Sequence, residues 1–264
     1  MSFRVFDSHC HIDPETYGGA EGVLAVIETA RAAGVERMLT VGAGYGNGSA
    51  ARAVQVADAH EGVWASVGMH PHDASELSDA VLAELVELAS HPKVLAWGEI
   101  GLDFYYDNSP REVQREAFRR QIRTALELEL PIIIHDRDSA GEVMRVLDEE
   151  SAWQGRGVLY HCYAGGLAEL EPLLERGAIL SIPGTVTFNK STELQEVARR
   201  VPADRFLVET DAPFLTPEPL RGRKNEPAHV ALTVEFIAGL RGESSAQVAQ
   251  TSWDNASRFF GLPA

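Results

Sequence analysis

Short apolar runs alternate with amphipathic stretches along the whole chain, and this regularity limits the possible folds more than any other feature. The apolar runs, several of them rich in Val and Ile, have the length and composition of buried parallel strands. They lie at residues 3–6, 37–41, 63–67, 94–97, 132–134, 158–160, 179–182 and 206–208. The stretches between them have helical periodicity, at residues 22–33, 49–59, 78–89, 111–129, 140–149, 167–175, 193–200 and 228–240.

Eight strand–helix units within about 240 residues favour an α/β fold of the (β/α)8 TIM-barrel type, as a single domain spanning 1–264. A doubly wound sheet is the alternative. It rarely needs eight evenly spaced units, and the chain lacks a G-x-G-x-x-G fingerprint. The glycine-rich run 42–48 fits neither this fingerprint nor a phosphate-binding loop, so we expect a flexible βα loop there. Two extra C-terminal helices, at 244–251 and 254–260, are expected to close the barrel.

Composition indicates a packed globular protein, because 45% of the 264 residues are hydrophobic. Lys and Arg number 23 against 39 Asp and Glu, and the net charge of −16 disfavours a nonspecific nucleic-acid coat. An anionic substrate in a locally positive cleft remains possible. No apolar stretch is long enough to span a membrane, and the start lacks the apolar run of a signal peptide. Cys10 and Cys162 cannot form a disulfide framework. We therefore expect a cytoplasmic protein with no membrane association and no obligate protein partner.

Histidines and carboxylates gather where the predicted strands end. In a barrel these positions share the C-terminal rim, where active sites are built. The residues are His9, His11, Glu99, His135, His161 and Asp211. Side chains alternate along a strand, so His9 and His11 should point the same way and Cys10 the other way. One buried histidine is more often a hydrogen-bonded core residue than a ligand, but six such residues on one rim favour a metal site.

The ligand types restrict the metal. Imidazole with carboxylate suits zinc, manganese, iron or nickel, and no thiolate set is present for a structural zinc site. Six ligands are too many for one catalytic ion that must keep a position open. Two ions bridged by a carboxylate are the natural solution.

Seven short motifs follow one another in a fixed order. They are F-D-S-H-C-H from Phe6, G-M-H-P-H from Gly68, G-E-I-G-L-D-F from Gly98, I-H-D-R from Ile134, H-C-Y-A-G from His161, E-T-D-A-P from Glu209 and R-G-R-K-N-E-P from Arg221. With them the sequence resembles the TatD family of metal-dependent deoxyribonucleases over nearly its whole length. Tyr163-Ala164 and Ile182-Pro183-Gly184 depart from the commoner family pattern without touching a proposed ligand.

The resemblance implies two divalent ions, zinc, manganese or magnesium. His9 and His11 would hold the first, His135 and His161 the second, and Glu99 would bridge them. Asp211 would bind the first ion and act as general base toward the attacking water. Glu99 and Asp211 are thus the expected catalytic residues. The implied activity is a deoxyribonuclease that trims single-stranded or frayed ends, with DNA bound transiently in a local cleft.

Four further residues are candidates for substrate binding: His70, Arg137, Arg223 and Lys224. His70 lies at the rim of the third predicted strand, and the three cations are close enough in the predicted topology to hold phosphates. Each also fits an ordinary structural or solvated role. Asp7 and Asp103 are expected to brace ligands or backbone.

Two other functions remain open. One is a metal-dependent amidohydrolase or esterase acting on a small molecule or on an aminoacyl ester such as D-aminoacyl-tRNA, since a fold does not select the bond that is cleaved. The other is a non-enzymatic binding module, which the complete ligand set disfavours.

Overall fold

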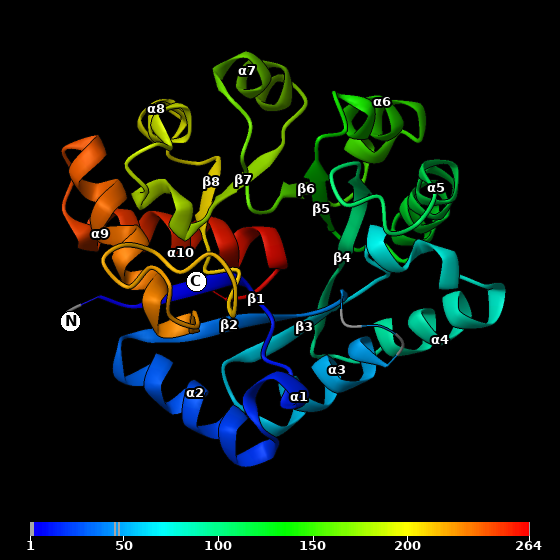
Figure 1. Cartoon of the computed structure of the whole chain (residues 1–264), viewed down its shortest axis with the longest axis horizontal. Coiled ribbons are helices and arrows are strands. Elements are labelled where there is room, and N and C mark those ends of the chain that lie inside the picture. The colour runs from blue at the N-terminus through cyan, green and yellow to red at the C-terminus, as the bar shows by residue number, and fades with distance from the viewer. Residues whose placement is uncertain (1–2, 45, 47, 264) are drawn as a thin grey trace. The chain divides into compact units, whose positions relative to one another are not determined.

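The computed structural model describes residues 3–44, 46 and 48–263 (Figure 1). Its strands follow the chain order β1 to β8 in the sheet. Strands pair in parallel in β1–β2, β3–β4, β4–β5, β5–β6 and β7–β8. The strands are β1 (Val5–Cys10), β2 (Val35–Gly42), β3 (Val63–Val67), β4 (Val94–Asp103), β5 (Ile132–Arg137), β6 (Val158–Tyr160), β7 (Ile179–Ile182) and β8 (Phe206–Val208). Tyr45 and Asn47 of the glycine-rich run lie outside the described residues.

At least one helix follows each strand. The α-helices are α1 (Pro14–Tyr17), α2 (Ala20–Ala32), α3 (Ser49–Ala59), α4 (Asp79–Ala89), α5 (Arg111–Glu127), α6 (Glu142–Glu149), α7 (Leu167–Glu175), α8 (Thr192–Arg200), α9 (Val230–Arg241) and α10 (Ser245–Phe260). Short 3-10 helices are η1 (Pro71–Glu76), η2 (Ala152–Gln154), η3 (Gly184–Thr187) and η4 (Pro227–His229). Among the described residues, no helix has the length and apolar character needed to cross a membrane.

The chain forms two compact units, and the first comprises residues 1–40, 161–175 and 179–264. In it β7 pairs with β8, β1 pairs with β2, and Cys10 at the end of β1 bridges to Ala212 beyond β8. Helix α10 packs against β1 and β8 (Figure 1). The ring of Trp253 on α10 lies 6.4 Å from that of Phe6.

The predicted pair of C-terminal helices is wrong, because α10 runs unbroken from Ser245 to Phe260. No Gly or Pro interrupts it, and Ser252 and Trp253 at the expected break are buried. Ser252 and Trp253 belong to the buried face of this helix, and the Ser252 hydroxyl accepts a hydrogen bond from Val208 N–H.

The second unit comprises residues 41–160 and 176–178, with β3, β4, β5 and β6 paired in that order. Two buried glutamines of α5 fix the carboxyl ends of its strands. Gln121 pairs through its amide with both backbone groups of Met69, at 2.7 and 3.0 Å. Gln114 pairs in the same way with Asp103, at 2.8 and 3.1 Å. These contacts hold the backbone beside His70 and at the end of β4.

Strands β1 and β4 are longer than predicted. His9 lies inside β1 and Glu99 inside β4, although both were expected to follow their strands. The apolar run marks only the part of each strand that faces the core with apolar side chains. The polar continuation is equally buried, with His9 at 0% and Glu99 at 3% exposure.

Gly101 explains why glycine recurs within β4. A Cβ at this position would lie 1.9 Å from the carbonyl oxygen of His135 on β5, and its φ is +150°. The two strands can therefore approach here only without a side chain.

We expect Gly101→Ala to lower the free energy of unfolding by about 1–3 kcal/mol or more, because the strands must separate and the backbone conformation is strained. Urea unfolding at constant metal concentration measures the change. Gly239→Ala is the matched control. Gly239 lies within α9 with open space around it. The control should be stabilised by up to about 1 kcal/mol. Equal stability of the two variants would contradict the close-approach explanation.

Candidate metal centre

The first unit brings together His9, His11 and Asp211, which we call the first cluster. One nitrogen or oxygen from each residue lies within 4.8 Å of the others. The Nε2 atoms of His9 and His11 are 3.8 and 3.6 Å from Asp211 Oδ1. All three residues are buried. The prediction that both imidazoles of the His-x-His motif face the same way is confirmed, and Cys10 between them points to the backbone of Leu39.

Backbone pairing between β1 and the segment after β8 builds this cluster. His11 N–H donates to Ala212 O at 2.7 Å, and Asp211 N–H donates to His9 O at 2.9 Å. Asp211 adopts φ of 55°, a left-handed conformation that Asp and Asn tolerate better than most residues. Asp7, fully buried, accepts hydrogen bonds from both the N–H and the hydroxyl of Thr210. Its expected role of bracing the neighbouring backbone is thus confirmed.

His161 lies beside the first cluster, immediately after β6. Its ring stacks on that of His9, with centroids 3.8 Å apart and an interplanar angle of 11°. Glu209 also lies close to His161, with Oε1 3.6 Å from His161 Nδ1. The same oxygen accepts a hydrogen bond from Cys162 N–H at 2.6 Å. Burial raises the pKa of Glu209, and its proximity to His161 opposes that rise. Sequence reasoning missed Glu209, although its place two residues before Asp211 in the E-T-D motif was a usable signal.

The second unit brings together His70, Glu99 and His135, which we call the second cluster. His135 Nδ1 lies 3.3 Å from Glu99 Oε2 and 3.3 Å from His70 Nε2. His70 Nε2 is 4.0 Å from Glu99 Oε1. His70, predicted to bind substrate, therefore lies directly among the proposed ligands.

Asp103 contacts the second cluster through the imidazole of His135. Its Oδ2 is 2.8 Å from His72 Nε2 and 3.2 Å from His135 Nε2. Burial acts to raise the pKa of Asp103, but hydrogen bonds with His135 and His72 hold it well below the ordinary value. A carboxylate on one imidazole nitrogen orients the other toward a metal, so Asp103 points His135 Nδ1 toward Glu99. The predicted bracing role of Asp103 is confirmed.

The three candidate cations have different surroundings. The Arg137 guanidinium lies over the rings of Tyr105 and Tyr106 in the second unit. In the first unit the Lys224 ammonium donates to Thr16 O at 2.7 Å and lies over the Tyr17 ring. The side chain of Arg223 is exposed.

The donor sets fit divalent metal ions. Each cluster supplies two imidazoles and one carboxylate, the combination expected for zinc or manganese. The thiol of Cys10 is unsuited to a ligand role, because burial raises its pKa and it donates to a backbone carbonyl.

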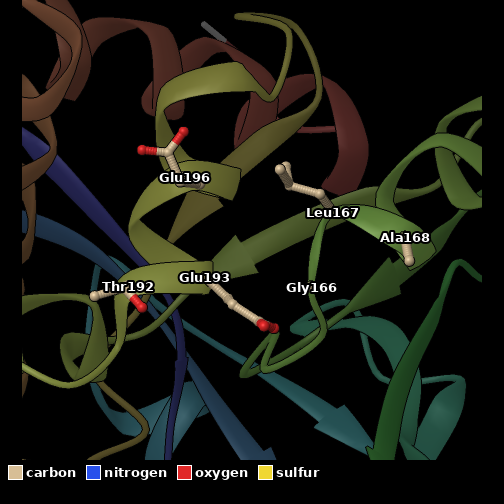
Figure 2. A pocket seen from close by; sticks show the side chains of 6 residues that line it. All are labelled: Gly166, Leu167, Ala168, Thr192, Glu193 and Glu196. Atoms are coloured by element: carbon tan, nitrogen blue, oxygen red, sulfur yellow. The ribbon is translucent and has the colours of Figure 1, made fainter.

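A hollow of about 340 Å³ lies between the starts of α7 and α8, and its lining lacks the imidazoles of the two clusters. Glu193, Glu196 and small or apolar residues line it, without imidazole or thiol (Figure 2).

Comparison with known proteins decides the family. The family profile of TatD related DNases matches residues 6–261. The chain belongs to the TatD family. This TatD-family chain is 40% identical over 258 residues to an uncharacterized metal-dependent hydrolase, YabD, of Bacillus subtilis, covering 98% of this chain and 99% of the relative. A 3'-5' ssDNA/RNA exonuclease TatD of Shigella flexneri is 36% identical over 244 residues, covering 90% of this chain and 92% of the relative.

A solved structure agrees with the fold. The crystal structure of YJJV, a TatD homolog from Escherichia coli, matches with a TM-score of 0.90 at 28% identity and covers 100% of both chains. Together with the strand order, this match confirms the α/β class and the (β/α)8 barrel. The TatD-family chain is accordingly a metal-dependent hydrolase.

Proposed function

We propose that this hydrolase cleaves phosphodiester bonds of DNA, working from single-stranded or frayed ends. The observation that carries the proposal is the pair of clusters, each with two imidazoles and a carboxylate at metal-ligand spacing. A relative named as a 3'-5' ssDNA/RNA exonuclease, matched over 90% of this chain, supports the choice of substrate.

In the proposed arrangement His9, His11 and Asp211 would hold one divalent ion, His135 and His161 would hold the other, and Glu99 would be a ligand of both. This assignment follows family membership. It takes His161, which lies beside the first cluster, as a ligand and leaves out His70 of the second cluster. When bound, two such ions lower the pKa of an attacking water and neutralise charge on the phosphoryl oxygens.

Asp211 is the proposed general base. Its Oδ1 lies 3.6 Å from His11 Nε2, and its side chain is 12% exposed, so water can reach it. It would take the proton of the attacking water and deliver it to the leaving oxygen. Glu99, buried at 3% exposure, would hold its ligand geometry without competing as a base. Arg137, Arg223 and Lys224 are the proposed contacts for substrate phosphates.

Activity of the metal-reconstituted protein tests this function. We expect hydrolysis of end-labelled single-stranded DNA, slower hydrolysis of blunt duplex, and loss of activity on chelation that divalent metal restores. A panel of amides, esters and aminoacyl esters is assayed beside the DNA. Turnover of a panel member with inert DNA would replace the nuclease by an amidohydrolase or esterase. Activity that survives complete chelation would contradict the metal centre itself.

A further inference from the structure

Two adjacent tyrosines stand out on the surface of the second unit, directly after β4. Tyr105 is 60% exposed and Tyr106 is 54% exposed. Their rings meet edge to face, with centroids 4.9 Å apart. The guanidinium carbon of Arg137 lies 4.3 Å from the Tyr105 ring centroid and 4.8 Å from that of Tyr106. Large aromatic side chains this exposed add little to the core, so they need another explanation.

The tyrosines are tied to the second cluster through one carboxylate. Asp103 Oδ1 accepts the backbone N–H of Tyr105 at 3.0 Å and of Tyr106 at 2.9 Å. Its Oδ2 faces His72 and His135. The Tyr106 ring also contacts the His72 ring edge to face, at 5.4 Å. The exposed rings are therefore held at a fixed distance from a proposed metal ligand.

Arg137 has no ion pair within the described part of the chain. Nearby arginines differ, since Arg111 pairs with Asp107 at 2.7 Å and Arg115 with Glu142 at 2.7 Å. Arg137 thus keeps its charge for an anion while its planar group lies along the tyrosine rings.

We propose that Tyr105, Tyr106 and Arg137 form a stacking site for the bases of single-stranded nucleic acid, with Arg137 also meeting the backbone phosphate. This inference rests on the proposed nuclease function and specifies how that site takes its substrate. A chain with net charge −16 attracts polyanions poorly at long range, so affinity must come from short-range contacts. Aromatic stacking supplies them for any base, and only where bases are unstacked from a duplex.

The test compares two substrates on the metal-loaded protein. One is a short oligothymidylate, and the other has the same sugar–phosphate backbone without bases. Tyr105→Ala/Tyr106→Ala should raise KM for the oligothymidylate about tenfold or more. It should leave kcat within about twofold, because stacking acts alike in ground and transition states. On the abasic strand the variant and the wild type should have equal KM. Tyr105→Phe/Tyr106→Phe keeps the rings and should restore the wild-type KM.

Arg137→Ala should raise KM on both substrates and reduce the salt dependence of binding. Arg156→Ala is its matched control. Arg156 is equally an exposed arginine, placed before β6 at the amino ends of the strands. Its loss should change neither constant.

The outcomes separate the stacking site from the nuclease function. If wild-type protein cleaves oligothymidylate and the double alanine variant has an unchanged KM, the stacking site is refuted and the nuclease function stands. An equal rise in KM on the abasic strand would also refute base stacking. If wild-type protein cleaves neither strand, both proposals fall.

Discussion

Asp211→Asn is expected to keep the fold and most of the metal while lowering kcat by about 10²–10⁴-fold, the usual contribution of a general base. Asparagine is nearly isosteric and tolerates the left-handed φ of 55° that this position requires. Its carbonyl oxygen can still face His9 and His11. The lost property is a carboxylate that accepts a proton. We expect a loss near the middle of that range, because the neutral side chain leaves the metal site more positive and favours water ionisation.

Turnover of the asparagine variant, with its metal content matched to wild type, measures this effect. A fully loaded variant within about threefold of wild type would fall short of the general-base range. Asp211 would then be a ligand only. His70, 3.3 Å from His135 and 4.0 Å from Glu99, would become the next candidate for the base.

Glu99→Ala is expected to have the second large effect, with kcat reduced at least about 10²-fold and less metal retained per chain. The substitution removes a buried carboxylate that lies 3.3 Å from His135 Nδ1. In the proposed arrangement Glu99 would be the one ligand shared by both ions. His9→Ala removes a ligand of one ion only. We therefore expect it to lower kcat and the metal content per chain by less than Glu99→Ala does.

Metal content and kcat of the two alanine variants, measured side by side, decide between one and two ions. Glu99→Gln is the conservative control, since it keeps the shape of the side chain and loses its charge. Equal losses in Glu99→Ala and His9→Ala would argue for a centre with a single ion.

Much of the fold follows from the apolar pattern alone. Strands β3, β6, β7 and β8 have the predicted boundaries, and helices α3 and α7 begin and end as predicted. Buried parallel strands need apolar side chains on both faces, so they appear in the sequence as short continuous runs. The pattern fails where polar residues occupy buried strand positions, as in β1 and β4.

The gathering of histidines and carboxylates could be predicted, because a strand has a side-chain period of two and strand ends share one rim. A bracing role for Asp103 could be predicted as well, but its particular partners could not. Asp103 reaches His72, His135 and the backbone of Tyr105 at once, and no local pattern encodes three such partners. The contact between Lys224 and Tyr17 could not be predicted either. The two residues are 207 positions apart in the sequence (224 − 17), and only the fold brings the ammonium group over the tyrosine ring.

The metal stoichiometry of the pure protein tests the central claim most directly. The protein is stripped with chelator, titrated with zinc or manganese, and analysed for bound metal beside the variants His9→Ala/His11→Ala and His135→Ala/His161→Ala, each of which removes two proposed ligands of one ion. Two imidazole–carboxylate clusters predict two ions per wild-type chain and about one in each double variant. Wild-type protein that binds no divalent ion, or that keeps full hydrolytic activity without one, would contradict the account.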